Sequence, residues 1–297
     1  MARLRFRKYR VPEKAFIVGA HAFLVLFAAV CAFPFLNVLA KSFSPEFYIQ
    51  QGQVWLWPVK VTLNGYEKIF EAQGIVLGFR NSLVVGIVGT AVNLLMSSLI
   101  AYPLSRKRLP LRRTFVTVVV FTMLFPTGII PMYILVKSLG LINSLWALIL
   151  PYAITTFNMI IVKNYFQTIP DSLEESAFID GAGELTILFR IFVPLSKPVI
   201  AAIGLFYLIA NWNIFMPAVL FLTSPSKYTI QVVLRDILTQ HMLEDQLPFD
   251  RGALMSKAGP EAIQAAVTIA AMLPILAIYP FLQGYFTRGI MIGSVKG

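Results

Sequence analysis

The chain has 297 residues, of which 58% are hydrophobic and 13% charged, with a formal net charge of +11 and a mean hydropathy of +0.75. This composition leaves too few polar residues to cover a water-soluble globular fold, and it indicates an integral membrane protein. The positive charge does not indicate a nucleic-acid partner, because the basic residues flank apolar runs rather than gather on one folded face.

Six charge-free apolar runs follow one another along the chain, each long enough for a helix to cross the hydrocarbon core of a bilayer. They occupy residues 15–40, 81–105, 114–136, 138–162, 198–222 and 262–287. The sequence therefore predicts an all-α integral membrane fold with six transmembrane helices in one domain, 1–297. Prolines inside the runs predict kinked helices.

The first run follows a basic segment and could be a signal peptide. It is too long for a signal-peptide core, so we interpret it as a retained first helix. Cys31, the only cysteine, lies in this run, which excludes a disulfide framework and a cysteine metal site. An aromatic-rich outer segment, 41–80, follows, and it fits either an interfacial belt or a sugar-contacting surface.

Basic residues indicate the orientation of these helices, because cytoplasmic segments are enriched in lysine and arginine. If both termini are cytoplasmic, sixteen of the twenty-five basic residues lie inside. They are Arg3, Arg5, Arg7, Lys8, Arg10, Lys14, Arg106, Lys107, Arg108, Arg112, Arg113, Lys163, Arg190, Lys197, Arg288 and Lys296. We therefore expect cytoplasmic termini.

The long inner loop, 163–197, predicts a helix, a turn and a second helix. Asp171 and Ser172 each precede a glutamate by three residues, which predicts a capping box at a helix start. Gly181 and Gly183 are expected to end that helix. An apolar stripe then predicts an amphipathic helix ending before Pro194. The stripe consists of Leu185, Leu188, Phe189 and Phe192.

This loop resembles the EAA loop of the permeases of ABC importers, the cytoplasmic segment that docks on an ATP-hydrolysing subunit. The matching positions are Glu175, Ala177, Asp180, Gly181, Ala182, Phe189, Ile191, Pro194, Leu195 and Pro198, with conservative departures at Ser176 and Val193. A purely structural loop needs a cap and a turn but does not need all of these offsets. The resemblance implies that Glu175, Ala177, Asp180, Gly181, Ala182, Phe189, Ile191 and Pro194 couple the chain to an ATPase.

Other segments extend the resemblance over roughly residues 10–297. Residues 126–140 are similar to the third span and turn of these permeases. The tail, 283–297, is similar to a branch linked to complex oligosaccharides, including uronate-containing ones such as aldouronate and alginate fragments. The resemblance implies the second permease subunit of a maltose-type carbohydrate importer, with a type I importer fold in a bacterial inner membrane.

Polar residues within the spans are uncharged amides beside aromatic residues. Those of interest are Asn158, Asn211, Trp212, Asn213 and Phe215. Amides and aromatic rings suit a path for a hydroxyl-rich solute, but asparagine also serves as a hydrogen-bonding contact between packed helices. Both interpretations stay open. Residues 211–217 are similar to a Trp-Asn-acid-Phe segment of carbohydrate permeases, with Ile214 in place of the acid.

No phosphate-binding loop of the Gly-x-x-x-x-Gly-Lys type occurs, so we expect ATP and Mg²⁺ to be bound by a partner and no cofactor in this chain. His21 and His241 stand far apart, and no catalytic or metal-ligand pattern is present. The alternatives are an ion-coupled transporter, which the absence of acidic residues in the spans disfavours, and a membrane-embedded transferase.

The importer interpretation implies several partners. They are a sister permease, two ATPase subunits, an extracytoplasmic solute-binding protein, the oligosaccharide and membrane lipid. The outer loop, 223–261, mixes both charge signs, and it fits either a docking surface for the binding protein or a solvated linker.

Overall fold

A computed structural model describes residues 11–125, 127–239 and 259–289, with side chains over 16–125, 127–239 and 259–278. The predicted positions of both termini, much of the outer loop and the end of the tail lie outside these ranges. The chain divides into two compact units, residues 1–71 with 250–269 and residues 72–249 with 270–297. Each unit is described by itself, and the single permease domain stays a prediction.

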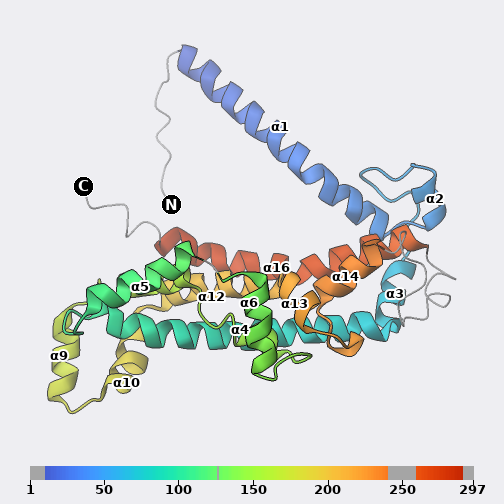
Figure 1. Cartoon of the computed structure of the whole chain (residues 1–297). Helices are drawn as coiled ribbons and strands as arrows, with labels where there is room; N and C mark the ends of the chain where they lie inside the picture. The colour runs from blue at the N-terminus through green and yellow to red at the C-terminus, as the bar shows by residue number, and fades with distance from the viewer. Residues whose placement is uncertain (1–10, 126, 240–258, 290–297) are drawn as a thin grey trace. The chain divides into compact units, whose positions relative to one another are not determined.

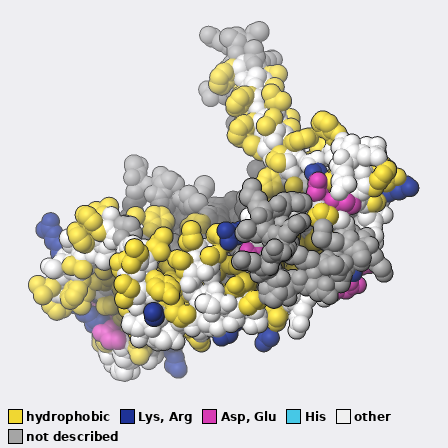
Figure 2. Space-filling model, turned by 45° about the vertical axis from the view of Figure 1, so that its right-hand side comes forward, with side chains coloured by type: hydrophobic (Ala, Val, Ile, Leu, Met, Phe, Trp, Pro, Cys, Tyr) yellow, Lys and Arg dark blue, Asp and Glu magenta, His cyan; other side chains and the backbone are white. Residues whose placement is uncertain are grey.

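The first unit contains α1 (Val11–Ser42), α2 (Glu46–Gln50), α3 (Asn64–Glu71) and the start of α16 (Pro260–Gly289). The Glu46 carboxylate accepts hydrogen bonds from the backbone N–H groups of Glu261 and Ala262, at 3.3 and 3.0 Å. A carboxylate at this position satisfies free amides at the start of α16. The apolar side chains of α1 are largely exposed, as the visible part of this helix shows in Figure 2. An exposed helix of this composition is suited to lipid or to a neighbouring chain.

The second unit is built around α4 (Gln73–Ser105), which packs against α8, α12 and α14 (Figure 1). Its other elements, in chain order, are α5 (Arg112–Leu124), α6 (Ile129–Ser138), α7 (Trp146–Ile149), α8 (Thr156–Phe166), α9 (Asp171–Ile179), α10 (Glu184–Ile187), η1 (Leu188–Phe192), α11 (Val193–Leu195), α12 (Lys197–Trp212), α13 (Met216–Phe221), η2 (Pro225–Lys227) and α14 (Ile230–Thr239), followed by the rest of α16. Glycine and serine on α4 allow close packing, since Gly86 and Gly89 face α12.

The described residues are mostly helical, and three of their helices are long and apolar enough to cross a membrane: Phe16–Ser42, Gln73–Ser105 and Pro260–Ile278. The number rises to five if two bent pairs each form one span. These pairs are α5 with α6, bent by 112°, and the segment Glu184–Leu195 with α12, bent by 88°. The expected span 138–162 is divided between α7 and α8, and α8 alone extends only about 16 Å. The sixth span therefore stays a proposal.

Candidate functional site

The inner loop folds into a short helix, a glycine turn and a second helical segment, as predicted. Helix α9 begins at Asp171, and the chain leaves it at Gly181, whose φ of +82° lies in the left-handed region. A residue with a Cβ is strained at that φ, so glycine is the residue suited to the turn.

Two details of the loop differ from the prediction. The capping box is wrong, because Pro170 caps α9 without a side-chain hydrogen bond and Glu174 points instead to basic residues. The second helical segment does not end before Pro194. A π-helical turn over Leu188–Phe192 lets the Val193 N–H donate to the Leu188 carbonyl, five residues back, and the helix continues through Pro194 to Leu195. The wider turn accommodates a proline that an α-helix interior would not.

The burial of the apolar stripe also differs from the prediction. Leu188 and Phe192 are buried together with Ile187, whereas Leu185 and Phe189 are exposed. The buried three belong to an apolar core formed with α4, α8 and α12. Only half of the predicted stripe therefore faces the protein.

A buried arginine connects the loop to the end of α4. Arg106 is 4% exposed, and its Nη1 lies 3.1 Å from Glu174 Oε2 and 3.3 Å from Asp171 Oδ1. Its Nη2 donates to the Phe166 carbonyl, and its guanidinium lies 4.6 Å from the centre of the Phe192 ring. A buried guanidinium is stable only with partners of this kind, because desolvating an unpaired charge is costly.

A second arginine and a tyrosine complete the network. Arg108 Nη2 lies 2.7 Å from Glu174 Oε1 and 2.6 Å from Glu184 Oε1. The Tyr102 hydroxyl donates to Glu184 Oε2 at 2.8 Å and lies 3.2 Å from Glu174. We call this group the loop clamp. Its members are Tyr102, Arg106, Arg108, Asp171, Glu174 and Glu184.

Sequence reasoning missed the loop clamp, because it assigned Arg106 and Arg108 only to the orientation of the helices. One signal was available. Three consecutive basic residues, 106–108, end one span, and three of the acids in the inner loop are their partners. Such a match of opposite charges between two inner segments predicts ion pairing.

The motif residues of the loop divide between two environments. Ala177 is buried, and Ala182 and Ile191 pack against the core that contains it. The remaining motif side chains, Glu175, Asp180, Phe189 and Pro194, are exposed, as is Gly181. Beside them Ile179 is 86% exposed and Leu185 is also exposed. The loop thus presents acidic and apolar side chains that no described residue of this chain covers.

The amides of Asn211 on α12 and Asn93 on α4 have hydrogen-bond partners within the protein. Asn211 Nδ2 donates to Asn93 Oδ1 at 2.9 Å, and Asn93 Nδ2 donates to the Tyr152 carbonyl at 2.6 Å. Asn158 is also buried. These contacts join α12, α4 and the segment before α8, which favours the packing interpretation for Asn211.

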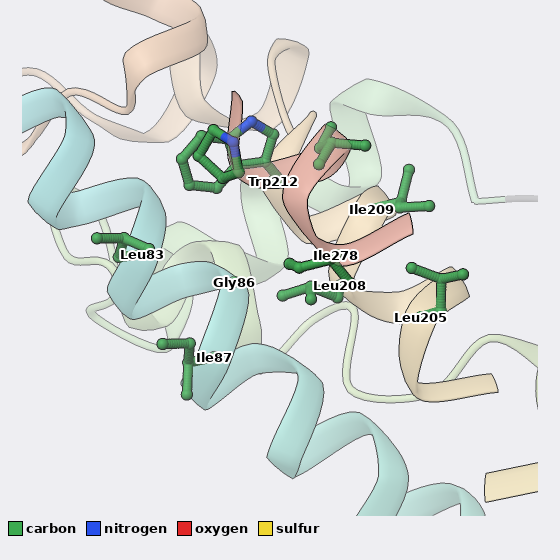
Figure 3. Close-up of a pocket in the computed structure, with 10 residues that line it drawn as sticks. Leu83, Gly86, Ile87, Leu205, Leu208, Ile209, Trp212 and Ile278 are labelled. Carbon is green, nitrogen blue, oxygen red and sulfur yellow. The ribbon is translucent and has the colours of Figure 1, made fainter. Parts of the chain in front are cut away.

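Trp212 is buried beside an apolar hollow (Figure 3). Its Nε1 donates to the Ala271 carbonyl at 3.0 Å. The hollow is lined by Leu83, Gly86, Ile87, Leu205, Leu208, Ile209, Trp212, Pro274, Ile275 and Ile278. A lining of this kind offers no polar side chain besides the occupied indole for sugar hydroxyls, and it is suited to an apolar occupant.

Asn213 and Phe215 lie differently from Asn211 and Trp212. Asn213 is exposed, and Phe215 is partly buried in the break between α12 and α13. Within the described ranges, no cluster of His, Cys, Asp and Glu side chains is arranged to hold a metal ion.

Comparison with known proteins identifies the family. Residues 93–292 match the family model described as "Binding-protein-dependent transport system inner membrane component". The chain is 45% identical, over 97% of its length and 100% of the relative, to the polygalacturonan/rhamnogalacturonan transport system permease protein YtcP of Bacillus subtilis. It is 44% identical to Protein LplC of the same organism, over 91% of this chain and 90% of the relative.

A solved structure shows the same fold. It is a chain from the crystal structure of a bacterial ABC transporter involved in the import of the acidic polysaccharide alginate, with a TM-score of 0.87 and 29% identity. The match covers 94% of this chain and 99% of that one. The chain therefore belongs to the family of binding-protein-dependent inner membrane components, the permease subunits of ABC importers, which transport solutes rather than catalyse a reaction.

Proposed function

We propose that this chain is the second permease subunit of an ATP-driven importer of oligosaccharides, and that its solutes carry uronate units. The relatives support this solute class, since one is named for polygalacturonan and rhamnogalacturonan and another comes from an importer of acidic alginate. The subunit works with a sister permease, two ATPase subunits and an extracytoplasmic binding protein. It crosses the inner membrane six times, and both termini are cytoplasmic.

The observation that carries the coupling role is the exposed face of the inner loop. Glu175, Asp180 and Ile179 point away from the core, while the loop clamp holds the other side of α9 against α4. A helix that is fixed on one face and uncovered on the other is suited to a groove on a partner. We propose that α9 inserts into a groove of the ATPase, and that Gly181 provides the turn that this contact needs.

Transport follows from this arrangement. When ATP closes the ATPase pair, α9 moves with it, and the loop clamp passes that motion to α4. The helices packed on α4 then open the path. We propose that the exposed Asn213 and the neighbouring Phe215 contact the solute. The residues Asn158, Asn211 and Trp212 form the layer behind the solute path and support its wall without contacting the solute.

Copurification tests the proposal directly. The tagged subunit is expressed with its genomic neighbours, and an ATPase is expected to copurify in a complex whose hydrolysis rises when loaded binding protein is added. The variant Glu175→Lys, which reverses a charge on the exposed face of α9, is expected to reduce recovery of the ATPase while the permease subunit remains in the membrane. A subunit that purifies without an ATPase and transports solute on an ion gradient would establish an ion-coupled transporter instead.

A further inference from the structure

The helix of the fifth span is interrupted in its outer part. Helix α12 ends at Trp212 and α13 begins at Met216, so Asn213, Ile214 and Phe215 form a break. The 16 residues of α12 extend about 24 Å from its start at Lys197. With Lys197 at the cytoplasmic surface, the break lies in the outer third of a hydrocarbon core about 30 Å thick. Interrupted helices at membrane depth are found where they line a solute cavity.

Helix α14 lies beside this break. The Gln231 Nε2 donates to Asn213 Oδ1 at 3.4 Å, and the Arg235 guanidinium lies 6.0 Å from the centre of the Phe215 ring. Gln231 and Arg235 are four residues apart and share one face of α14. The start of α14 is fixed to α4, because the Ile230 N–H donates to the buried Ser82 Oγ at 2.9 Å. Two elements thus bring two amides, an aromatic ring and a cation to one place.

The charge of Arg235 is not balanced by an ion pair among the described residues. Its side chain is exposed, and no described carboxylate lies within 4.0 Å of its nitrogens. The next residue, Asp236, is partly buried, and burial raises the pKa of its carboxyl group while the charge of Arg235 opposes that rise. The break, residues 213–215, contains no acidic residue, and its middle residue, Ile214, packs against an apolar core.

We propose that Asn213, Phe215, Gln231 and Arg235 form a subsite for an acidic sugar unit, in which Arg235 binds the carboxylate. A guanidinium presents paired N–H donors that match the two oxygens of a carboxylate. The Phe215 ring is partly buried, and its uncovered part offers an apolar contact for the sugar. The Asn213 amide donates to the Ile209 carbonyl at 2.9 Å and accepts from Gln231, and each of the two amides keeps a further N–H and a lone pair for the sugar hydroxyls. A neutral sugar leaves Arg235 without a partner, so the subsite distinguishes uronates from neutral sugars. This inference rests on the proposed importer function, and it adds the residue that recognises the negative charge of the solute.

The test uses the complete importer in proteoliposomes with its binding protein. ATP-driven uptake is measured for a galacturonate trisaccharide and for the same trisaccharide with its carboxyl groups reduced to alcohols. The binding protein is identical in every sample, so a change in the ratio of the two uptake efficiencies between variants comes from the permease. Arg235→Gln is compared with Arg235→Lys and with Arg80→Gln, which removes another exposed arginine of the same unit, on α4.

Arg235→Gln is expected to lower uptake of the acidic trisaccharide about tenfold, as for the loss of one charge-assisted contact, and to affect uptake of the reduced trisaccharide much less. Arg235→Lys should keep most of the preference, and Arg80→Gln should keep all of it. An unchanged ratio, or an equal loss for both sugars, overturns the subsite while the importer function stands. If the wild-type complex imports neither sugar and the binding protein does not stimulate its ATPase, the proposed function itself has failed.

Discussion

Substitution of Glu174 by glutamine removes the charge at the centre of the loop clamp. The Glu174 side chain is 7% exposed and is paired with the 4% exposed Arg106. Breaking a buried ion pair by removing one partner costs about 3–5 kcal/mol. Asp171 still faces Arg106 at 3.3 Å but is 58% exposed, so it compensates only in part. We expect a loss near the lower limit, about 3 kcal/mol, which raises the opening of α9 from α4 about 100-fold.

Amide hydrogen exchange of α9, measured on the permease in lipid nanodiscs, reports that opening. Exchange over Asp171–Ile179 should accelerate strongly in Glu174→Gln, while the middle of α4 should not change. Glu175→Gln, the same chemical change at the adjacent exposed position, is the matched control and should exchange like the wild type. Arg108→Gln should have an intermediate effect, because Arg108 is 49% exposed and such pairs contribute about 1 kcal/mol or less. Equal exchange in Glu174→Gln and Glu175→Gln would refute the role of the clamp.

Three further predictions follow from the turn, the helix packing and the orientation. Gly181→Val should strain the left-handed turn by about 1–2 kcal/mol and lower the amount of solute transported per ATP hydrolysed. Gly183→Val, at an ordinary φ of −79°, should have little effect. Equal transport per ATP in both variants contradicts the role of the turn. Gly89→Ala places a Cβ 2.8 Å from the Asn211 amide nitrogen and should lower the free energy of unfolding by about 1–3 kcal/mol, because a buried hydrogen bond is lost. Gly86→Ala, whose Cβ would lie 3.4 Å from its nearest atom, should be tolerated. Equal melting temperatures of the two variants would contradict the role of Asn211 in helix packing. A cysteine placed within the first ten residues of a cysteine-free variant should resist impermeant reagents in intact cells, and its modification would overturn the orientation.

The local features of the inner loop were predictable because they depend on neighbouring residues. The start of α9 lies where the sequence predicted it, although the predicted capping box is absent, and the end of this helix near Gly181 follows from the short-range preference of glycine. The loop clamp was not predicted, because its ion pairs join residues more than sixty positions apart and require the tertiary fold. The capping box failed for the same reason, since Glu174 has stronger partners in Arg106 and Arg108 than a free amide.

The apolar runs were predictable from the thickness of the bilayer, but the breaks within them were not. Residues 198–222 form one charge-free and mainly apolar run, yet the helix is interrupted at residues 213–215. Pro217 was the available signal, because it occupies the first turn of α13 and proline favours a helix start there. Arg235 was missed as a solute-binding candidate, because its proximity to Phe215 depends on α14 folding back against α4.

The most direct test of the account is ATP-driven uptake of a labelled uronate oligosaccharide by the reconstituted complex. The proteoliposomes contain this subunit, its sister permease and the ATPase, and the binding protein is added on the extracytoplasmic side of the membrane. The account predicts uptake only when ATP and binding protein are both present, and it predicts that Gly181→Val lowers uptake per ATP hydrolysed without releasing the subunit from the membrane. Uptake that proceeds without ATP on an ion gradient, or that is undiminished in Gly181→Val, would contradict it.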